Sequence, residues 1–245
     1  MTGLTVGKLV STNHDALAFA SADANLVTVL DVSGPAAPAS PVKVPVSVLG
    51  PSAVLAMGIG GPGSTPLHDL YLGSIYNSDP TPNRGTLFRN DGTKFSQLAE
   101  VTLSGAPARA NRIALKFGQP EVMAMLVSEE KGAALRVESL SSGKPEALTL
   151  VANLPAGSDY AVGNFRGSPL CEFVFYTAGG SNLTVRPVEE PSPGKFQVGA
   201  GGAFSLGQPI KQIIAVPNGG SKLLVIFGKG ETAGVFNFLR TSGLF

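Results

Sequence analysis

Short apolar runs alternate with turn-forming residues along the whole chain. The runs are rich in β-branched residues and are interrupted by Gly and Pro, a pattern typical of strands rather than helices. The 31 glycines and 19 prolines are spread over the sequence, and so many turn formers suit short strands joined by tight turns. The pattern therefore predicts an all-β fold.

The apolar runs repeat with a period of about fifty residues. Five segments consist of a charged residue followed by an apolar strand: Asp15–Ser21, Asp69–Ser74, Glu121–Ser128, Glu172–Thr177 and Lys222–Gly228. Their leading residues are 54, 52, 51 and 50 positions apart. A period this steady predicts one structural unit repeated five times.

Three further strands are predicted around each of these segments. Upstream lie Leu4–Gly7, Val54–Gly58, Ile113–Leu115, Tyr160–Gly163 and Ile213–Val216. Downstream lie Leu26–Leu30, Thr86–Arg89, Leu135–Val137, Leu183–Val185 and Val235–Phe238. A fourth strand follows in the first four units, at Val42–Val48, Phe95–Leu103, Ala147–Leu154 and Phe196–Leu206.

Four-stranded sheets repeated at this period predict a five-bladed β-propeller of antiparallel blades. We expect a single domain over 1–245, with blades at approximately 1–50, 51–106, 107–157, 158–208 and 209–245. The second strand of each unit is apolar on both faces, as expected for a sheet that other sheets cover on both sides.

The last unit ends soon after its third strand, so its blade lacks the outer strand. Two explanations stay open: a three-stranded last blade, or a chain that is a piece of a longer propeller. An unpaired sheet edge is a pairing site for another chain. The last-blade edge therefore predicts a homo-oligomer.

Composition and charge exclude several classes of function. Charged residues are only 14% of the chain and the net charge is +1, so nucleic-acid binding lacks its basic surface. No apolar window is long enough for membrane insertion, and Met1–Lys8 is not a signal peptide. The single Cys171 allows neither a disulfide within the chain nor a cysteine metal site.

The loop before the second strand carries a family resemblance. The fourth unit reads Ala161-Val-Gly-Asn-Phe-Arg-Gly-Ser-Pro-Leu-Cys-Glu-Phe173, and the second unit, Ala56 to Leu70, keeps the same frame with its closing Asp-Leu. The first unit, Val6 to Asp15, is a weaker match. These loops resemble FG-GAP/VCBS-type repeats, the blades of integrin-like propellers. The resemblance implies an extracytoplasmic protein, secreted or periplasmic.

Loops of that family often bind calcium through three or more spaced carboxylates, because this cation needs six to eight oxygen ligands. The fourth unit offers only Asn164 and Glu172, and the second only Asp69. We therefore expect neither calcium nor another cofactor or metal. The acids at the common repeat position are expected to be structural and to cap the loop: Asp15, Asp69, Glu121 and Glu172.

Candidate catalytic groups are few. His14 and His68 each precede a repeat aspartate, a pairing that a general base could use, but no serine nucleophile motif accompanies them. A five-bladed glycosidase-like enzyme would need two carboxyls about 5 to 10 Å apart, whereas the regular spacing of the acids favours a structural role. We expect no catalytic residues.

The best candidate for ligand binding is the longest insertion, Ile75 to Gly85, because loops on rigid scaffolds often carry binding residues. Tyr76, Asn77, Asp79 and Arg84 would suit a sugar hydroxyl or a peptide. The absence of tryptophan weakens the case for a lectin, since sugar faces usually stack on aromatic rings.

Together these features predict a non-enzymatic binding propeller that recognises a protein or glycan ligand, or an accessory domain of a larger protein. Three alternatives stay open: a carbohydrate-binding lectin, a glycosidase-like enzyme, and a structural or assembly module.

Overall fold

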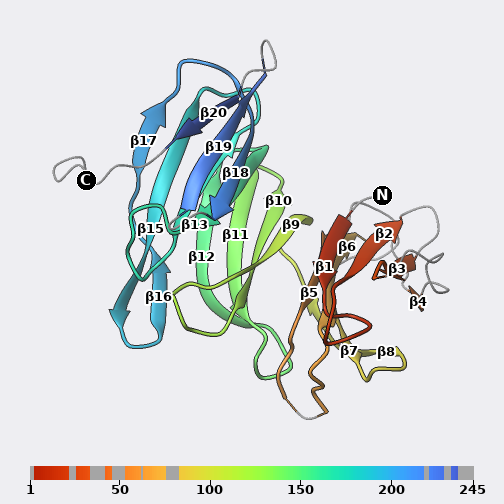
Figure 1. Ribbon diagram of the computed structural model, residues 1–245. Helices are drawn as coiled ribbons and strands as arrows, with labels where there is room; N and C mark the ends of the chain where they lie inside the picture. The colour runs from red at the N-terminus through yellow and green to blue at the C-terminus, as the bar shows by residue number, and fades with distance from the viewer. Residues whose placement is uncertain are drawn as a thin grey trace. The chain divides into compact units, whose positions relative to one another are not determined.

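The computed structural model describes residues 3–21, 26–33, 42–45, 53–61, 63–75, 83–217, 221–228 and 233–236. Every regular element in these ranges is a β-strand, and the strands β1 to β20 form five sheets of consecutive strands (Figure 1). The prediction of an all-β fold built from five repeated sheets is confirmed. The described residues contain no helix long and apolar enough to span a membrane.

The first two sheets follow the predicted pattern. The first has the order β1 (Gly3–Gly7), β2 (Ala16–Ser21), β3 (Leu26–Asp31) and β4 (Val42–Pro45). The second has the order β5 (Ala53–Met57), β6 (Asp69–Ile75), β7 (Asn83–Asn90) and β8 (Phe95–Thr102). Both are antiparallel throughout.

The third sheet consists of β9 (Ala106–Ile113), β10 (Val122–Glu129), β11 (Gly132–Ser139) and β12 (Glu146–Leu154). The predicted start of its first strand, at Ile113, is wrong, because β9 ends at that residue. Much of β9 is only partly buried, so it carries polar residues and lacks the apolar run on which the prediction depended.

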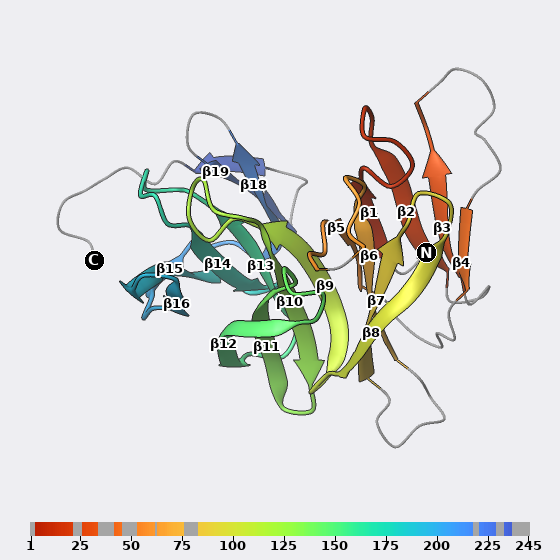
Figure 2. The same cartoon turned by 90° about the horizontal axis from the view of Figure 1, so that it is seen from below.

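The fourth sheet has five strands where four were predicted: β13 (Ser158–Gly163), β14 (Glu172–Thr177), β15 (Asn182–Ser192), β16 (Lys195–Val198) and β17 (Gly202–Ser205). The long β15 pairs with β17 along its first half and with β16 along its second (Figure 1). Figure 2 shows β15 and β16 side by side, seen from below. The single strand predicted over Phe196–Leu206 is thus divided.

One glycine explains the division. A Cβ at Gly201 would collide with the backbone carbonyl oxygen of Val185, whereas one at Gly199 would meet the flexible end of the Glu189 side chain. Gly201 therefore lets the chain pass close to the backbone of β15 between its two pairing registers.

The fifth sheet has three described strands, β18 (Ile210–Pro217), β19 (Ser221–Phe227) and β20 (Ala233–Phe236). The predicted lack of an outer strand in the last blade stays a prediction, because residues 237–245 lie outside the described residues.

The chain divides into two compact units. The first contains residues 1–112, 122–130 and 135–147, and the second contains 113–121, 131–134 and 148–245. The single domain over 1–245 and its blade boundaries therefore stay predictions.

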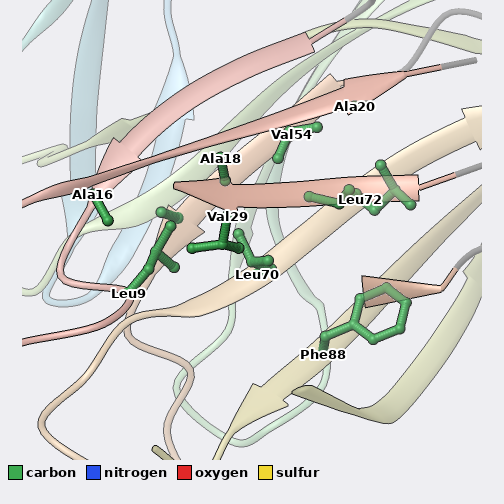
Figure 3. Packing of buried hydrophobic residues seen from close by; sticks show 11 residues of the cluster. Leu9, Ala16, Ala18, Ala20, Val29, Val54, Leu70, Leu72 and Phe88 are labelled. Atoms are coloured by element: carbon green, nitrogen blue, oxygen red, sulfur yellow. The ribbon is translucent and has the colours of Figure 1, made fainter. Parts of the chain in front are cut away.

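In the first unit, the first and second sheets share an apolar core (Figure 3). Every second residue of β2 is a buried alanine, at Ala16, Ala18 and Ala20, because successive strand residues face opposite sides of a sheet. These small side chains lie against Val54 and Leu72 of the second sheet.

The second sheet also carries a buried tyrosine on its opposite face. The Tyr71 ring covers Gly85 so closely that a Cβ there would collide with the phenol. Its hydroxyl donates a hydrogen bond to the Met125 sulfur of β10, at 3.2 Å. Because any side chain at Gly85 would displace the ring, this glycine fixes where the hydroxyl lies.

In the second unit, the fourth and fifth sheets share a second core. Val174 and Val185 of the fourth sheet pack with Ile213, Leu223 and Val225 of the fifth, and all five are at most 2% exposed. Burying an aliphatic side chain of this size stabilises a fold by about 1.5–3 kcal/mol. This face of the fourth sheet is therefore part of the core of the second unit.

A shared detail links the first four sheets. Two residues after the first strand of each sheet comes a large apolar residue that is at most 6% exposed: Leu9, Ile59, Leu115 and Phe165. We call these the plug residues. They lie in the loops that lead to the repeat acids.

Candidate functional site

Two of the repeat acids are enclosed by the loops that precede them. Asp69 is 1% exposed. Its carboxylate accepts hydrogen bonds from the N–H groups of Ile59 (2.9 Å) and Asn90 (2.7 Å), and the Arg89 guanidinium lies 3.6 Å away. Burial raises the pKa of Asp69, while these hydrogen bonds and Arg89 oppose the rise.

Glu172 repeats this arrangement in the fourth sheet. It is 1% exposed and accepts hydrogen bonds from the N–H of the plug residue Phe165 (2.8 Å) and from Arg166 Nε (2.9 Å). An acid thus holds the N–H of the plug residue in both sheets. Neither carboxylate is open to a substrate.

The other two repeat acids are exposed. The Asp15 side chain is 55% exposed and lies 3.5 Å from Lys8 Nζ, and Glu121 is also exposed. In the first sheet the plug residue Leu9 donates its N–H to the Gly7 carbonyl oxygen at 2.8 Å. Because that N–H already has a backbone partner, the loop needs no carboxylate there.

No group of three or more His, Cys, Asp and Glu side chains in the described part of the chain could hold a metal ion. Asn164, the other predicted oxygen donor of the fourth sheet, donates its side-chain amide to the Ser168 carbonyl oxygen. The positive charge beside Glu172 is the Arg166 guanidinium.

The structure describes one of the four predicted ligand-binding residues. Arg84 lies on β7 and forms an ion pair with Glu100 of β8, at 2.7 Å. Tyr76, Asn77 and Asp79 lie outside the described residues, so a site at this insertion stays a prediction.

The two histidines have different surroundings. His68 is half-buried; its Nδ1 accepts the Lys8 N–H at 3.2 Å, and an Arg112 guanidinium nitrogen lies 3.3 Å away. Burial and the Arg112 charge lower the pKa of His68. His14 Nε2 lies 3.1 Å from an Asp31 oxygen.

Cys171 is a buried free thiol beside Glu172. Burial raises its pKa to about 12, which keeps it in the unreactive thiol form.

The second unit contains a cavity of about 320 Å³ that we call the fourth-sheet pocket. It is lined by Asn153, Leu154, Pro155, Ser158, Phe175, Tyr176, Thr177, Gly180, Ser181, Asn182, Thr184 and Arg186. This volume is within the range of small-ligand sites in proteins.

Strand alternation builds the sheet side of the pocket. Phe175 pairs with Thr184, and Phe173 with Arg186, across β14 and β15. Directly opposed residues share one face of a sheet, so Thr184 and Arg186 lie on the face opposite to the valines packed on the fifth sheet. Asn182 lies on the same face, two residues before Thr184.

The end of β12 and the following turn form the other side. Asn153 has φ 57°, the one positive value among the described non-glycine residues, and asparagine tolerates this left-handed conformation better than most residues. The turn is closed by Ser158, whose N–H and hydroxyl both donate to the Pro155 carbonyl oxygen, at 3.1 and 2.7 Å.

Arg186 is held by an aromatic pair. Its guanidinium carbon lies 5.7 Å from the centroid of the Phe175 ring, which stacks on Phe173 at 5.9 Å. A Cβ at Gly201 would lie only 2.6 Å from Arg186 Cγ, so the glycine leaves room for the aliphatic part of the Arg186 side chain.

Four polar side chains of the pocket form no hydrogen bond or ion pair with other described residues. Within the part of the chain that the structure describes, Asn153, Asn182, Thr184 and Arg186 make no side-chain hydrogen bond or ion pair. Hydrogen-bonding groups gathered in a cavity without protein partners are available to a polar ligand.

Sequence reasoning missed all four of these residues. A readable signal existed in Asn-Leu-Thr-Val-Arg, residues 182–186, which alternates polar and apolar positions. In a sheet expected to be covered on both faces, a polar face on one strand indicates a cavity.

No family model and no curated protein matches the sequence. Among solved structures, a mutant of the Aleuria aurantia lectin in complex with Fucα1-6GlcNAc matches with a TM-score of 0.54 and 13% identity. The match covers 96% of this chain and 78% of the lectin chain. The mutant lectin with α-methyl-L-fucoside matches over the same shares, at 14% identity and a TM-score of 0.46.

A likeness at this identity establishes architecture alone. The resemblance to FG-GAP/VCBS-type repeats stays a prediction. The five consecutive sheets and the first of these matches together identify the fold of the chain as that of a β-propeller.

Proposed function

We propose that the protein is a non-enzymatic, glycan-binding propeller and that the fourth-sheet pocket holds a sugar residue. The observation that carries this proposal is the group of four polar side chains in the pocket that form no hydrogen bond or ion pair with the residues that the structure describes. Two amides, a hydroxyl and a guanidinium supply both donors and acceptors. Sugar hydroxyls need both, because each one donates and accepts.

The expected affinity for a single sugar is modest. Each hydrogen bond contributes about 0.5–1.5 kcal/mol after exchange with water, and association itself costs several kcal/mol. Asn153 and the closed turn at Ser158 reduce that cost, because their backbone is already ordered before a ligand arrives. Larger glycans that extend beyond the pocket should bind more tightly than a monosaccharide.

The lectin match supports a glycan as the first ligand to test. The Aleuria aurantia protein is a lectin bound to fucose-containing saccharides, and it shares the fold of this chain. Since a fold hosts many functions, the pocket rather than the fold supports binding by this protein.

The chemistry of the pocket favours binding over hydrolysis. Glycoside hydrolysis needs a pair of carboxyl groups beside the sugar, and the pocket lining contains neither a carboxylate nor a histidine. Asp69 and Glu172 are enclosed by their own loops. Among the described residues, therefore, no acid pair is in place beside this pocket.

A binding screen tests the proposal. The full chain is applied to an array of neutral, fucosylated and acidic glycans, in calcium and in chelator. We expect saturable binding to a subset of glycans. In Asn182→Ala/Thr184→Val binding should weaken about ten-fold or more, as expected for two lost hydrogen bonds. Thr102→Val, an exposed threonine at the end of β8, is the matched control.

Two outcomes would contradict the proposal. A blank array would remove glycan recognition and favour a protein partner or an assembly role. Equal binding by the double variant and Thr102→Val, with unchanged circular dichroism, would place the glycan site elsewhere.

A further inference from the structure

We infer that the fourth-sheet pocket selects saccharides that carry a carboxylate, and that Arg186 is the residue that determines this specificity. The inference rests on the proposed function of the pocket and names its ligand class. The ligand chemistry is a sugar ring with a carboxylate substituent. A uronic acid and a sialic acid both supply it.

The charge of the lining carries the first step. Arg186 is the one charged side chain among the twelve described lining residues. A guanidinium is always protonated in proteins, so the lining carries a positive charge and no acidic side chain. A neutral sugar would leave that charge without a counter-ion, whereas a carboxylated sugar would supply one.

The acids of the fourth sheet make their contacts with residues other than Arg186. Asp159, on the opposite face of the sheet, accepts the Tyr176 hydroxyl at 2.8 Å. Glu172 is bound by Arg166, and Glu190 by Lys116 at 2.6 Å. The remaining acid of β15 also accepts a hydrogen bond from another residue.

That acid is Glu189, which accepts the Gln197 amide at 2.7 Å. Glu172 and Glu190 form ion pairs with other cations, Asp159 and Glu189 accept hydrogen bonds from neutral groups, and Arg186 has no ion pair in the described part of the chain.

Arg186 has an aromatic neighbour that favours one position of its guanidinium. The guanidinium carbon lies over the Phe175 ring, 5.7 Å from its centroid, a distance at which a cation and a ring attract. Phe175 is 5% exposed and stacked on Phe173, so the support is rigid. A guanidinium fork matches a carboxylate through two parallel hydrogen bonds.

The remaining polar groups suit the sugar ring. Asn153, Asn182 and Thr184 are neutral and can donate to or accept from ring hydroxyls. One fixed cation and three neutral groups in about 320 Å³ fit a ring with a single charge. A multiply charged phosphate or acidic peptide would leave further charges unmatched.

Matched ligands test the inference. Binding of methyl β-D-glucuronide, methyl β-D-glucoside and the methyl glycoside of N-acetylneuraminic acid is measured by calorimetry or ligand-detected NMR. We expect at least one acidic sugar to bind about ten-fold or more tightly than the glucoside, with a preference that falls as salt rises. The tighter acidic sugar identifies the source of the carboxylate.

Variants assign the preference to its residue. Arg186→Gln should remove the preference for the acidic sugar, and Arg186→Lys should retain part of it, because lysine keeps the charge and loses the planar fork. Lys144→Gln removes one positive charge from an exposed turn and should change nothing. Circular dichroism verifies that each variant is folded, and the lysine variant tests the charge even if the glutamine variant fails to fold.

The possible results distinguish failure of the carboxylate preference from failure of glycan binding itself. If the glucoside binds as tightly as both acidic sugars, the pocket remains a glycan site and the carboxylate preference is overturned. A preference that persists in Arg186→Gln overturns the role of Arg186. If none of the three sugars binds and the glycan array is also blank, both proposals are overturned.

Discussion

At the scale of single residues, His68 shows how a loop fixes a protonation state. Its Nδ1 accepts the Lys8 N–H, so the ring must be unprotonated at that nitrogen. Burial and the Arg112 charge lower its pKa, with a smaller effect from the Lys8 ammonium, while the Asp15 carboxylate opposes them. The folded state therefore binds this proton less readily than the unfolded chain does.

We predict a pH-dependent stability from this residue. The unfolded histidine takes up a proton around pH 6.5, so the contribution of neutral His68 is complete above that pH and is lost as pH falls below it. His68→Asn keeps an acceptor without the titrating ring. The fall in Tm between pH 7 and pH 5, followed by circular dichroism, should be smaller in the variant. Equal falls in both proteins would contradict this assignment.

Sequence reasoning placed residues along the chain better than it explained them. It located the repeat acids but did not separate them into two kinds. Asp69 and Glu172 are buried and accept hydrogen bonds from backbone N–H groups, whereas Asp15 and Glu121 are exposed. The difference depends on where the N–H of each plug residue finds a partner, which is a property of the folded loop and not of the spacing.

At the scale of elements, the loop before the second strand depends on its acid. Asp69 joins the N–H of Ile59, before the strand, to the N–H of Asn90, at the end of the neighbouring strand. The side chain of Arg89 donates to the Ile59 and Gly60 carbonyl oxygens, both at 2.8 Å. One buried carboxylate thus stabilises a whole loop.

We predict that Asp69→Asn destabilises the protein by about 1–3 kcal/mol, because an amide can accept only one of the two N–H groups and the other is left buried without a partner. The value should lie toward the lower end, because burial raises the pKa of Asp69 and the neutral amide avoids that cost. Urea unfolding measures it. Glu121→Gln, at the exposed repeat position, should stay within about 0.5 kcal/mol, and equal loss in both variants would contradict a specific role for Asp69.

Element boundaries followed the apolar runs where those runs were strong. The buried β10 and β14 were placed to within a residue, because they are apolar on both faces. β9 and the β16–β17 pair were misplaced, because partly exposed strands carry polar residues and because Gly201 divides one expected strand into two.

At the scale of the whole molecule, the period of the sequence predicted the propeller fold and the number of sheets. It could not locate the pocket, because Asn153 comes from the end of one unit of the repeat and Arg186 from the middle of the next. A repeat pattern describes what the units share, whereas this cavity depends on side chains that differ among them.

The buried tyrosines give the protein a built-in optical reporter. The chain has four tyrosines and no tryptophan. Tyr71, in the first unit, and Tyr160 and Tyr176, in the second, are each at most 4% exposed. The near-ultraviolet signal of the folded protein therefore arises largely from side chains in its two cores.

The contact of Tyr71 with Gly85 and Met125 gives this reporter a pH signature. Burial raises the pKa of Tyr71 above its usual value, so the folded state favours the neutral phenol and stability is lost as pH rises above about 10. In an alkaline titration we expect tyrosinate absorbance to rise steeply at the pH where circular dichroism reports unfolding. Tyr71→Phe should reduce the step by one tyrosine. A gradual rise while the protein remains folded would mean that hydroxide reaches the phenol through transient openings of the core.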